Sequence, residues 1–538
     1  MKKLKKTNRK ISGGQIAVKS LMDQKVKYVF GLIGSATMEI FDALYGKSKI
    51  KFIGVRDERT GTHMADGYAR ASGNVGIILA GQNGPGATNL VTGLAQASAA
   101  FSPVVSIAGA SPIKSNTINE FQKVDQNSLF KPVTKKVFNI SKTEQIEKII
   151  SDAFIIAKKP RSGPVHLNVP RDILSTFIKY KKTKFKKKNI LKTKNNNFVK
   201  KINQTVKMLL KASKPVIIVG GGVKNSGNYT KILTLAKLLN SPIVTSAGHG
   251  DAIPYNNKFN AGQMGPRGNE VATNLTRNAD VILALGTRLG FNSTFYSYDN
   301  INKKANIIQI NQDKNSIGSY FPIKLGISAD FFYVIKELIN RFKIMKKKPN
   351  VDDWTNNFFD AKFTYLKNRD KNALSLNNSK LIQPASLFKV LRDTLPKNSL
   401  ITLDAGTLCL QATDALNYMK PPCLFTPLDF GLVGFSFACG LGVKVAKPNR
   451  PVISFIGDGG FGMTVSELST AVDNGINTVT LVMNNQCWGA EKAYQRDFFG
   501  GRYIGADVSS PPYDRLAELY GAAGFKVERL SDVADAVQ

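Results

Sequence analysis

The chain has 538 residues, long enough for about three domains, and its 43% hydrophobic and 21% charged residues are typical of globular proteins. The formal net charge is +37, from 75 basic and 38 acidic residues. Clustered Lys and Arg bind nucleic acid, but here the excess is diffuse, and no zinc-finger spacing or aromatic RNA-binding signature occurs. The composition therefore argues against nucleic-acid partners, whereas the positive field favours small anionic substrates.

The start of the chain and its cysteines bear on location. MKKLKKTNRK resembles the charged end of a signal peptide, but an amphipathic helix and a strand follow it in place of an apolar segment. No run reaches the ~18 apolar residues that a membrane helix needs. Cys409, Cys423, Cys439 and Cys487 form no C-x-x-C pair, which argues against a zinc site and suits a reducing cytosol. We expect a soluble cytoplasmic protein with no membrane partner.

Three α/β segments succeed one another along the chain. Residues 11–178 alternate short apolar runs, such as YVFGLIG and VGIILAG, with stretches of helical periodicity. Residues 199–342 (PVIIVGGG, DVILALGTR) and 381–538 (SLITLD, PVISFIGD, TVTLVMNN) repeat this alternation. The pattern is typical of a parallel sheet covered by helices on both faces. The sequence therefore predicts an α/β protein with three doubly wound parallel-sheet domains.

Lysine-rich stretches separate the segments. The stretch Lys179–Lys201 has no acidic residue, and KIMKKKPNVDDW comes after the second segment. The first stretch predicts an exposed connection, with a tether to a membrane surface or polyanion as the alternative. After the helix-like SDVADAVQ, another strand and helix would be needed to complete a larger sheet. Either the third sheet closes early or the C-terminus is incomplete, and the sequence leaves both open.

A glycine-rich turn in the third segment carries the first chemical signal. GDGGFG, from Gly457 to Gly462, lies between the apolar run PVISFI and the helical pattern MTVSELSTAV, so its backbone N–H groups favour a phosphate. A dinucleotide site would need an acid after the next strand, but TVTLVM ends in Asn484 and Asn485. Asp458 and Asn485, at the ends of neighbouring strands, suit Mg²⁺ beside a phosphate. A glycine turn with a surface Asn pair is the alternative.

GDG, a spacer of this length and NN resemble the thiamine-diphosphate motif of the acetolactate synthase superfamily, and MTVSELSTAV is similar to the segment after GDG in those enzymes. The resemblance implies thiamine diphosphate and Mg²⁺ as cofactors, with the metal on Asp458, Asn485 and the backbone carbonyl of Cys487. It also implies that Val433, in DFGLVGF, bends the cofactor into a V. The implied cofactor-binding residues are Gly34, Gly84, Gly406, Thr407, Gly431, Val433, Gly457, Asp458, Gly459, Gly460 and Asn485.

The first segment contains the second half of the implied site. VRDERTGTHMADGYAR resembles the family pattern H-E-x-x-x-x-H-M-A-D-G-Y-A-R, which places the family's glutamate at Glu58. In these enzymes the glutamate meets the pyrimidine ring of a cofactor held by a partner chain, where it favours the imino tautomer. Asp57 stands where the family usually has His, and adds a negative charge beside the base. Without the resemblance, Glu58 would be interpreted as a surface carboxylate at a strand end.

Substrate contacts are implied by the same resemblance. GQNGPGATNL and FQKVDQ resemble loops that face the substrate side of the cofactor. Basic or hydrogen-bond-donating groups are the groups that anionic substrates require. The candidates for shaping the pocket are His63, Gln82, Asn83, Gln122, Trp488, Lys492 and Arg502. Because the resemblance covers essentially the whole chain, it implies a homodimer or homotetramer with active sites between chains.

Sub-family features narrow the expected reaction. GQNGPG, NNQCWGAEKAYQ followed by RYIG, and LGTRLGFNSTF resemble the sulfoacetaldehyde acetyltransferases, which convert sulfoacetaldehyde and phosphate to acetyl phosphate and sulfite. An acetolactate synthase or another 2-keto-acid decarboxylase or ligase, acting on pyruvate, is the alternative. A polyanion-binding protein without catalysis is disfavoured by the presence of Glu58, Asp458 and Asn485.

The middle segment bears on a flavin. The feature that marks the flavin site of acetolactate synthases, an Arg followed by paired acidic residues, is absent, because Arg288 leads into LGFNS. We therefore do not expect FAD. The turn at Pro215–Gly222 could hold a nucleotide, although a bare strand–helix turn is the simpler interpretation.

Overall fold

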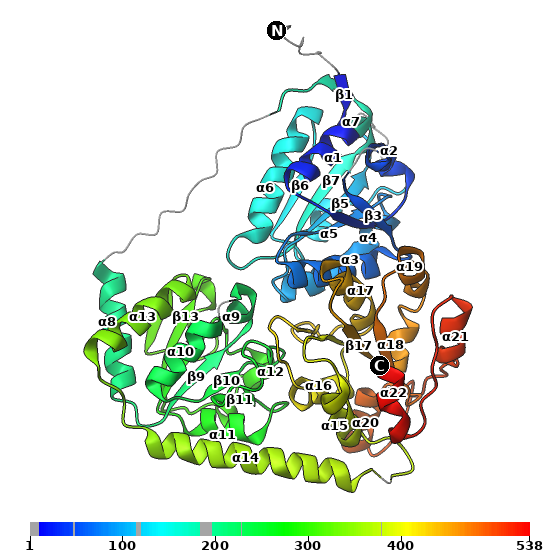
Figure 1. Cartoon of the computed structure of the whole chain (residues 1–538). Coiled ribbons are helices and arrows are strands. Elements are labelled where there is room, and N and C mark those ends of the chain that lie inside the picture. Colours follow the sequence, from blue (N-terminus) through cyan, green and yellow to red (C-terminus); the bar gives the residue numbers. More distant parts are fainter. Residues whose placement is uncertain (1–9, 47–48, 114–119, 183–195, 228, 378) are drawn as a thin grey trace, which may run out of the picture.

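Three parallel β-sheets, each flanked by helices, succeed one another along the chain in the computed structural model (Figure 1). The structure describes residues 10–46, 49–113, 120–182, 196–227, 229–377 and 379–538. The α/β class that the alternating pattern predicts is therefore confirmed. Most of the lysine-rich connection, residues 183–195, and the basic start of the chain lie outside the described residues. No helix in the described ranges is long and apolar enough to cross a bilayer.

The N-terminal sheet has the strand order β3-β2-β4-β5-β7-β6, and all its strands are parallel. Central strands such as β4 are buried along their whole length, which explains their continuous apolar sequence. A short antiparallel pair, β1 (Lys10–Ser12) with β8 (Phe177–Lys179), closes the domain. The other elements are β2 (Tyr28–Leu32), β3 (Lys51–Gly54), β4 (Gly76–Ala80), β5 (Val104–Ala110), β6 (Lys136–Asn139), β7 (Val165–Pro170), α1 (Gly13–Asp23), α2 (Met38–Leu44), α3 (Glu58–Ser72), α4 (Pro85–Ala99), α5 (Gln126–Phe130), α6 (Ile146–Lys158) and α7 (Arg171–Ser175).

The central sheet has the order β11-β10-β9-β12-β13-β14 and is also parallel. Helix α8 begins at Asn196, inside the stretch predicted to be an exposed connection, because Ile202, Val206 and Leu209 bury one face of it against this domain. The elements are β9 (Pro215–Val219), β10 (Ile243–Thr245), β11 (Asn260–Gln263), β12 (Val281–Leu285), β13 (Asn306–Asn311), β14 (Leu325–Ser328), α8 (Asn196–Leu210), α9 (Gly221–Ser226), α10 (Tyr229–Leu239), α11 (Glu270–Asn278), α12 (Phe291–Thr294) and α13 (Phe331–Met345).

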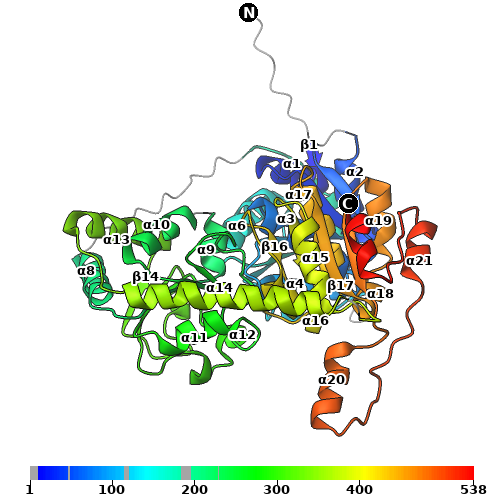
Figure 2. The same cartoon turned by 60° about the horizontal axis from the view of Figure 1, so that its bottom comes forward.

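The C-terminal sheet has four parallel strands in the order β16-β15-β17-β18. Among the described residues beyond Met483, the chain forms helices α20, α21 and α22 and adds no strand to this sheet. Helix α20 extends away from the rest of the domain (Figure 2). The elements are β15 (Leu400–Leu403), β16 (Leu424–Phe425), β17 (Val452–Gly457), β18 (Val479–Met483), α15 (Pro384–Thr394), α16 (Thr407–Ala415), α17 (Ser436–Ala446), α18 (Asp458–Gly462), α19 (Glu467–Asn474), α20 (Gly489–Phe498), α21 (Tyr513–Leu519) and α22 (Val533–Val537).

Helices α3 and α17 join the N-terminal and C-terminal domains within one chain. They cross so closely that a Cβ on Gly67 would collide with the backbone oxygen of Cys439, and a Cβ on Gly442 with that of Met64. One apolar cluster runs through this contact and includes side chains of both domains. The position of α3, whose first residue is Glu58, is therefore set by both domains.

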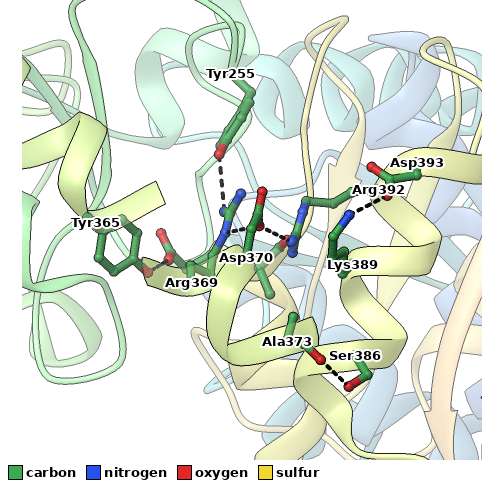
Figure 3. Close-up of polar contacts among 11 residues, drawn as sticks. Tyr255, Tyr365, Arg369, Asp370, Ala373, Ser386, Lys389, Arg392 and Asp393 are labelled. Atoms are coloured by element: carbon green, nitrogen blue, oxygen red, sulfur yellow. Dashed lines mark hydrogen bonds and ion pairs between the residues drawn. The ribbon is translucent and has the colours of Figure 1, made fainter. Parts of the chain in front are cut away.

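Helix α14 (Asp352–Ser375) runs from the central domain to the C-terminal domain (Figures 1 and 2). A polar network fixes it there (Figure 3). Arg369 donates to the hydroxyl of Tyr255 at 3.1 Å, and Asp370 accepts from Arg392 of α15 at 2.6 Å. Tyr365 donates to Asp414 of α16 at 2.8 Å. The central domain is thus anchored to α16, the helix that begins at the predicted cofactor residue Thr407.

Candidate active site

Glu58 is the first residue of α3, directly after β3, and only 4% of it is exposed. Asp57 caps the helix, because its carboxylate accepts from the backbone N–H of Arg59 at 2.6 Å. The side chain of Asn89, on α4, donates to Oε2 of Glu58 at 3.0 Å. The second oxygen, Oε1, lies 3.0 Å from the position that a Cβ on Gly86 would take. The carboxylate is therefore held against the first turn of α4.

Four effects set the acidity of Glu58. Burial raises the pKa of its carboxyl group above the usual value, because it disfavours the charged form. The hydrogen bonds from Asn89 and from the backbone of Glu58 oppose this, and the negative charge of Asp57 adds to it. A raised pKa favours the protonated carboxyl group, which can donate a proton to a ligand.

Loops at the ends of β2, β4 and β5 gather beside Glu58. Gly34 packs directly against Gly81, and Ser35 and Gln82 exchange hydrogen bonds. Asn83 donates to the backbone oxygen of Gln122 at 3.1 Å. At Gly84, with a φ of +54°, a Cβ would lie 2.6 Å from the same oxygen, so only glycine fits. The Cβ of Gln82 and Oε1 of Glu58 both border Gly86. The structure thus brings Gln82, Asn83, Gly84 and Gln122 together on the Glu58 side.

His63 lies elsewhere on α3. It is 1% exposed, its ring is 5.4 Å from that of Phe435 in the C-terminal domain, and both ring nitrogens lack a hydrogen-bond partner among the described residues. Burial lowers the pKa of this imidazole to about 3, so the ring is neutral. A buried neutral ring between two domains offers no charge to an anion. The substrate contact of His63 stays a prediction.

The predicted metal ligands lie at the carboxyl ends of β17 and β18. These strands pair in parallel with Gly457 opposite Met483, so Asp458 and Asn485 come after neighbouring strand ends. Asp458 is 1% exposed. Burial raises the pKa of the Cys487 thiol, and the negative charges of Asp458 and Asp507 add to it. A carboxylate, an amide oxygen and a backbone carbonyl form a donor set that suits Mg²⁺.

Glycines beside these ligands leave room for a diphosphate. At Gly406, Gly431 and Gly457, an added Cβ would meet no described atom within 4 Å, so the backbone faces open space. Gly406 and Gly431 have φ values of +122° and +75°, which favour glycine. Gly460 is closely packed, against Val433 and Asp404. The residues present therefore fit a cation and a diphosphate at this edge of the sheet.

Asp404 connects the turns that surround this space. Its carboxylate accepts from the backbone N–H groups of Gly434 at 3.0 Å and Phe435 at 2.8 Å. Burial raises its pKa to about 6. The residue holds the turn that carries Val433 against the end of β15 and the GDGG turn. The resemblance pointed to Gly406 and Thr407, which follow Asp404 in the sequence, but not to this role of Asp404.

The remaining predicted substrate residues come after β18. The ring of Trp488 lies 2.7 Å from the position that a Cβ on Gly459 would take, so it covers part of the GDGG turn. Lys492 forms an ion pair with Asp507 at 2.5 Å, so its charge already has a partner. Arg502 is exposed on the segment that returns from α20. Of these three side chains, Trp488 is the one that contacts the predicted cofactor turn.

A separate cavity of about 410 Å³ lies between the central domain and its two neighbours. It opens at the switch point of the central sheet, between β9 and β12, where ligands of such sheets commonly bind. Arg161 and Arg288 both lie over the ring of Phe101, at 4.8 and 4.6 Å from the ring centre. The cavity is lined by Gly221, Gly222, Gly286 and several basic side chains, including Lys224.

Comparison with known families agrees with this geometry. Residues 11–129 match the N-terminal TPP binding domain of thiamine pyrophosphate enzymes, residues 202–338 their central domain and residues 404–538 their C-terminal TPP binding domain. Thiamine pyrophosphate is the same compound as thiamine diphosphate. The three sheets correspond to these three domains in chain order. The chain belongs to the thiamine-diphosphate-dependent enzymes.

Relatives that match nearly the whole chain carry two different names. A probable acetolactate synthase large subunit of Methanococcus aeolicus is 32% identical, over 98% of this chain and 90% of the relative. A sulfoacetaldehyde acetyltransferase of Castellaniella defragrans is 30% identical, over 97% and 89%. Acetolactate synthase isozyme 3 large subunit of Escherichia coli is 31% identical, over 96% and 90%. The family resemblance in the sequence is therefore confirmed, while similar identities leave the substrate to other evidence.

Proposed function

We propose that this enzyme is a sulfoacetaldehyde acetyltransferase, which converts sulfoacetaldehyde and phosphate to acetyl phosphate and sulfite. The observation that carries the proposal is the stretch NNQCWGAEKAYQ, followed by RYIG, which resembles that sub-family. Its position supports the proposal, since the stretch includes Asn485 and its Trp488 covers the GDGG turn. Residues here border both the cofactor and the substrate, so they are suited to distinguishing one thiamine enzyme from another.

The cofactor contacts in this proposal come from both halves of the site. Asp458, Asn485 and the backbone carbonyl of Cys487 would hold Mg²⁺, and the glycines that face open space would leave room for the diphosphate. Val433 would support the bound cofactor. When bound, thiamine diphosphate supplies a nucleophilic carbon that can add to an aldehyde. Glu58 would hold a proton at the pyrimidine ring, and burial, which raises the pKa of its carboxyl group, favours the protonated form.

The substrates are small anions in this proposal. A sulfonate and a phosphate need hydrogen-bond donors and positive charge. The amides of Gln82, Asn83 and Gln122 supply donors on the Glu58 side of the site, and Trp488 and Arg502 border the opposite side. The net charge of +37 favours the approach of both anions. Lys492 forms an exposed ion pair with Asp507, so part of its positive charge is already compensated.

We further propose that the enzyme is a homodimer or homotetramer whose sites form between chains. The contacts of Glu58 with Asn89 and Gly86 come from its own N-terminal domain. Those of Asp458, with Ser510 and Tyr513, come from the C-terminal domain. A partner chain that brings its Glu58 to this metal site would complete it. We also propose that the central cavity holds no flavin, and the absorbance of the purified enzyme near 450 nm (roughly where flavins absorb) tests this.

A substrate panel with purified enzyme, Mg²⁺ and thiamine diphosphate tests the proposed reaction. We expect phosphate-dependent release of sulfite from sulfoacetaldehyde, with acetyl phosphate formed in equal amount. The alternative, an acetolactate synthase, is favoured by the names of two of the relatives. Formation of acetolactate from pyruvate, with no sulfite released from sulfoacetaldehyde, would establish the alternative and exclude the proposal.

Substitution of Glu58 by Gln tests the assignment of the base. Glu58→Gln keeps the shape of the side chain and the contact with Asn89, but removes the exchangeable carboxyl proton. We expect turnover to fall by about 10²-fold or more, a typical size for loss of a general acid or base. Cofactor affinity, measured by fluorescence quenching, should stay within about threefold of the wild-type value, because the metal half of the site is unchanged. Near-normal turnover would contradict the role of Glu58.

A further inference from the structure

Ser510 contacts the predicted metal ligand from a part of the chain that the motifs do not include. After α20 the chain returns to the C-terminal domain, and Cys487 and Asp507 form an isolated antiparallel bridge there. The backbone N–H of Val508 donates to the oxygen of Gln486 at 2.9 Å. This pairing brings Ser510 beside the GDGG turn. The hydroxyl of Ser510 donates to Oδ2 of Asp458 at 2.5 Å.

Tyr513 contacts the same residue through the backbone. Its hydroxyl donates to the carbonyl oxygen of Asp458 at 2.9 Å, and its ring meets that of Phe461 edge to face, with centres 5.0 Å apart. Asp458 is therefore held at its carboxylate by Ser510 and at its backbone by Tyr513. Both contacts come from the stretch between α20 and the first residue of α21.

The two carboxylate oxygens of Asp458 have different surroundings. A short hydrogen bond from Ser510 to Oδ2 fixes the rotation of the carboxylate, which leaves Oδ1 for a cation. Groups that orient a metal-binding side chain commonly change metal affinity by about 10- to 100-fold when they are removed. Asp458 is almost fully buried and Ser510 partly buried, so loss of the hydroxyl removes a hydrogen bond from a largely enclosed carboxylate.

We propose that Ser510 is a positioning residue for the metal site: it orients the carboxylate of Asp458 for the divalent cation, with Tyr513 fixing the backbone of the same residue. This inference rests on the proposed function only through the assignment of Asp458 as a metal ligand. It does not depend on which aldehyde or keto acid the enzyme uses.

Binding of Mn²⁺ to the full-length protein tests this role without any substrate. Free Mn²⁺ is measured by electron paramagnetic resonance in the presence of thiamine diphosphate. We expect Ser510→Ala to weaken Mn²⁺ binding by about tenfold. Ser510→Thr, which keeps a hydroxyl, should restore most of the affinity. Ser509→Ala is the matched control, because Ser509 is exposed and no hydrogen bond joins its side chain to Asp458 among the described residues, and it should bind like the wild type.

Two further variants distinguish a wrong positioning role of Ser510 from a wrong assignment of the metal site. Tyr513→Phe removes a single hydroxyl and should weaken Mn²⁺ binding less than Ser510→Ala, since the carboxylate keeps its partner. If Ser510→Ala binds Mn²⁺ as well as the wild type or better, the positioning role is wrong. Asp458→Ala should abolish Mn²⁺ binding at this site, and undiminished binding would instead overturn the metal site itself. An unchanged melting temperature of metal-free Ser510→Ala would show that lost affinity is not lost folding.

Discussion

Glu58 lies between two neighbours that shift its acidity in opposite directions. Asn89 stabilises the charged carboxylate through a hydrogen bond, whereas Asp57 destabilises it through like charge, and burial adds to the effect of Asp57. The family pattern has His at the position of Asp57. In this chain the residue serves two purposes, since its carboxylate also caps α3. Burial sets most of the upward shift in the pKa of Glu58, and the residue that caps its helix adds to it.

Substitution of Asp57 by Asn tests this tuning. Asn caps helices about as well as Asp, so Asp57→Asn removes the charge and keeps the cap. The loss of the neighbouring negative charge should lower the pKa of Glu58. Any limb of the pH profile of kcat/KM that reports Glu58 should then move to lower pH. The profile is measured with the best substrate of the panel.

The direction of the shift is the decisive result. A limb that stays in place or moves to higher pH would contradict the electrostatic coupling of Asp57 and Glu58. Asn89→Ala provides the opposite comparison, because it removes the hydrogen bond that lowers the pKa of Glu58. Its limb should move to higher pH.

For single residues, motif spacing predicted the residue types of the candidate site. It did not predict the contacts that hold their side chains in place. Glu58, Asp458 and Asn485 belong to local patterns that can be read from the sequence. Their supporting contacts join positions far apart: Asn89 is 31 residues from Glu58, and Ser510 is 52 from Asp458. Asn89 lies within GQNGPGATNL and could have been noticed. Ser510 comes after helix α20, and no motif in that stretch indicates that the chain returns to the C-terminal domain. The contact of Ser510 with Asp458 is therefore apparent only from the fold.

Helix α19 connects the cofactor turn of the C-terminal domain to the start of α3. Its first residue, Glu467, is buried and accepts from the backbone N–H of Arg56 at 2.9 Å and from the hydroxyl of Thr60. Thr470 donates to its other oxygen at 2.6 Å. Arg56 and Thr60 lie on either side of Glu58 in the sequence. The position of the predicted base is thus linked to the helix that comes after the GDGG turn.

Glu467→Ala should lower the melting temperature of the protein more than an exposed substitution on the same helix does. It leaves the N–H of Arg56 without its partner in a partly buried contact, at a cost of about 1–3 kcal/mol. The hydroxyls of Thr60 and Thr470 keep the backbone oxygens of Asp57 and Gly54 as acceptors. Asp473→Ala is the matched control on the same helix, because its ion pair with Arg56 at 2.6 Å is largely exposed. Such a pair contributes about 0–1 kcal/mol. Melting temperatures of the two variants provide the comparison, and equal shifts would contradict the importance of Glu467.

Elements were predictable where the pattern of burial was regular. Continuous apolar runs in the sequence predicted β4, β9, β12 and β17. These strands are buried on both faces, which explains why their sequences do not alternate with polar residues. The start of α8 was missed, since its apolar positions begin in a stretch dominated by Lys and Asn. The close crossing of α3 and α17 was not predictable either, because Gly67 and Gly442 have meaning only once the two helices meet.

In the whole molecule, the two halves of the candidate site lie on different domains: Glu58 on the N-terminal domain and the predicted metal ligands on the C-terminal domain. In one chain, α3 and α17 join these domains through their helices, and Glu58 is enclosed by contacts with its own domain. The carboxyl ends of β17 and β18 carry the metal half. Domain order and fold class could be predicted from the sequence. Whether Glu58 meets the metal ligands of its own chain or those of a partner chain depends on the assembly.

Complementation between two inactive variants tests whether active sites form between chains. In a symmetric dimer, Glu58→Gln and Asp458→Ala each disable both sites. A mixed dimer would contain one site with both defects and one site with neither, because Glu58 of one chain meets Asp458 of the other. Differently tagged chains are expressed together and the mixed dimer is purified by both tags. We expect it to recover about half of the wild-type activity per dimer. Each variant paired with itself, carrying both tags, is the control and should be inactive. If the mixed dimer is as inactive as the controls, Glu58 serves the metal site of its own chain, and the two halves must meet by a movement of domains within one chain.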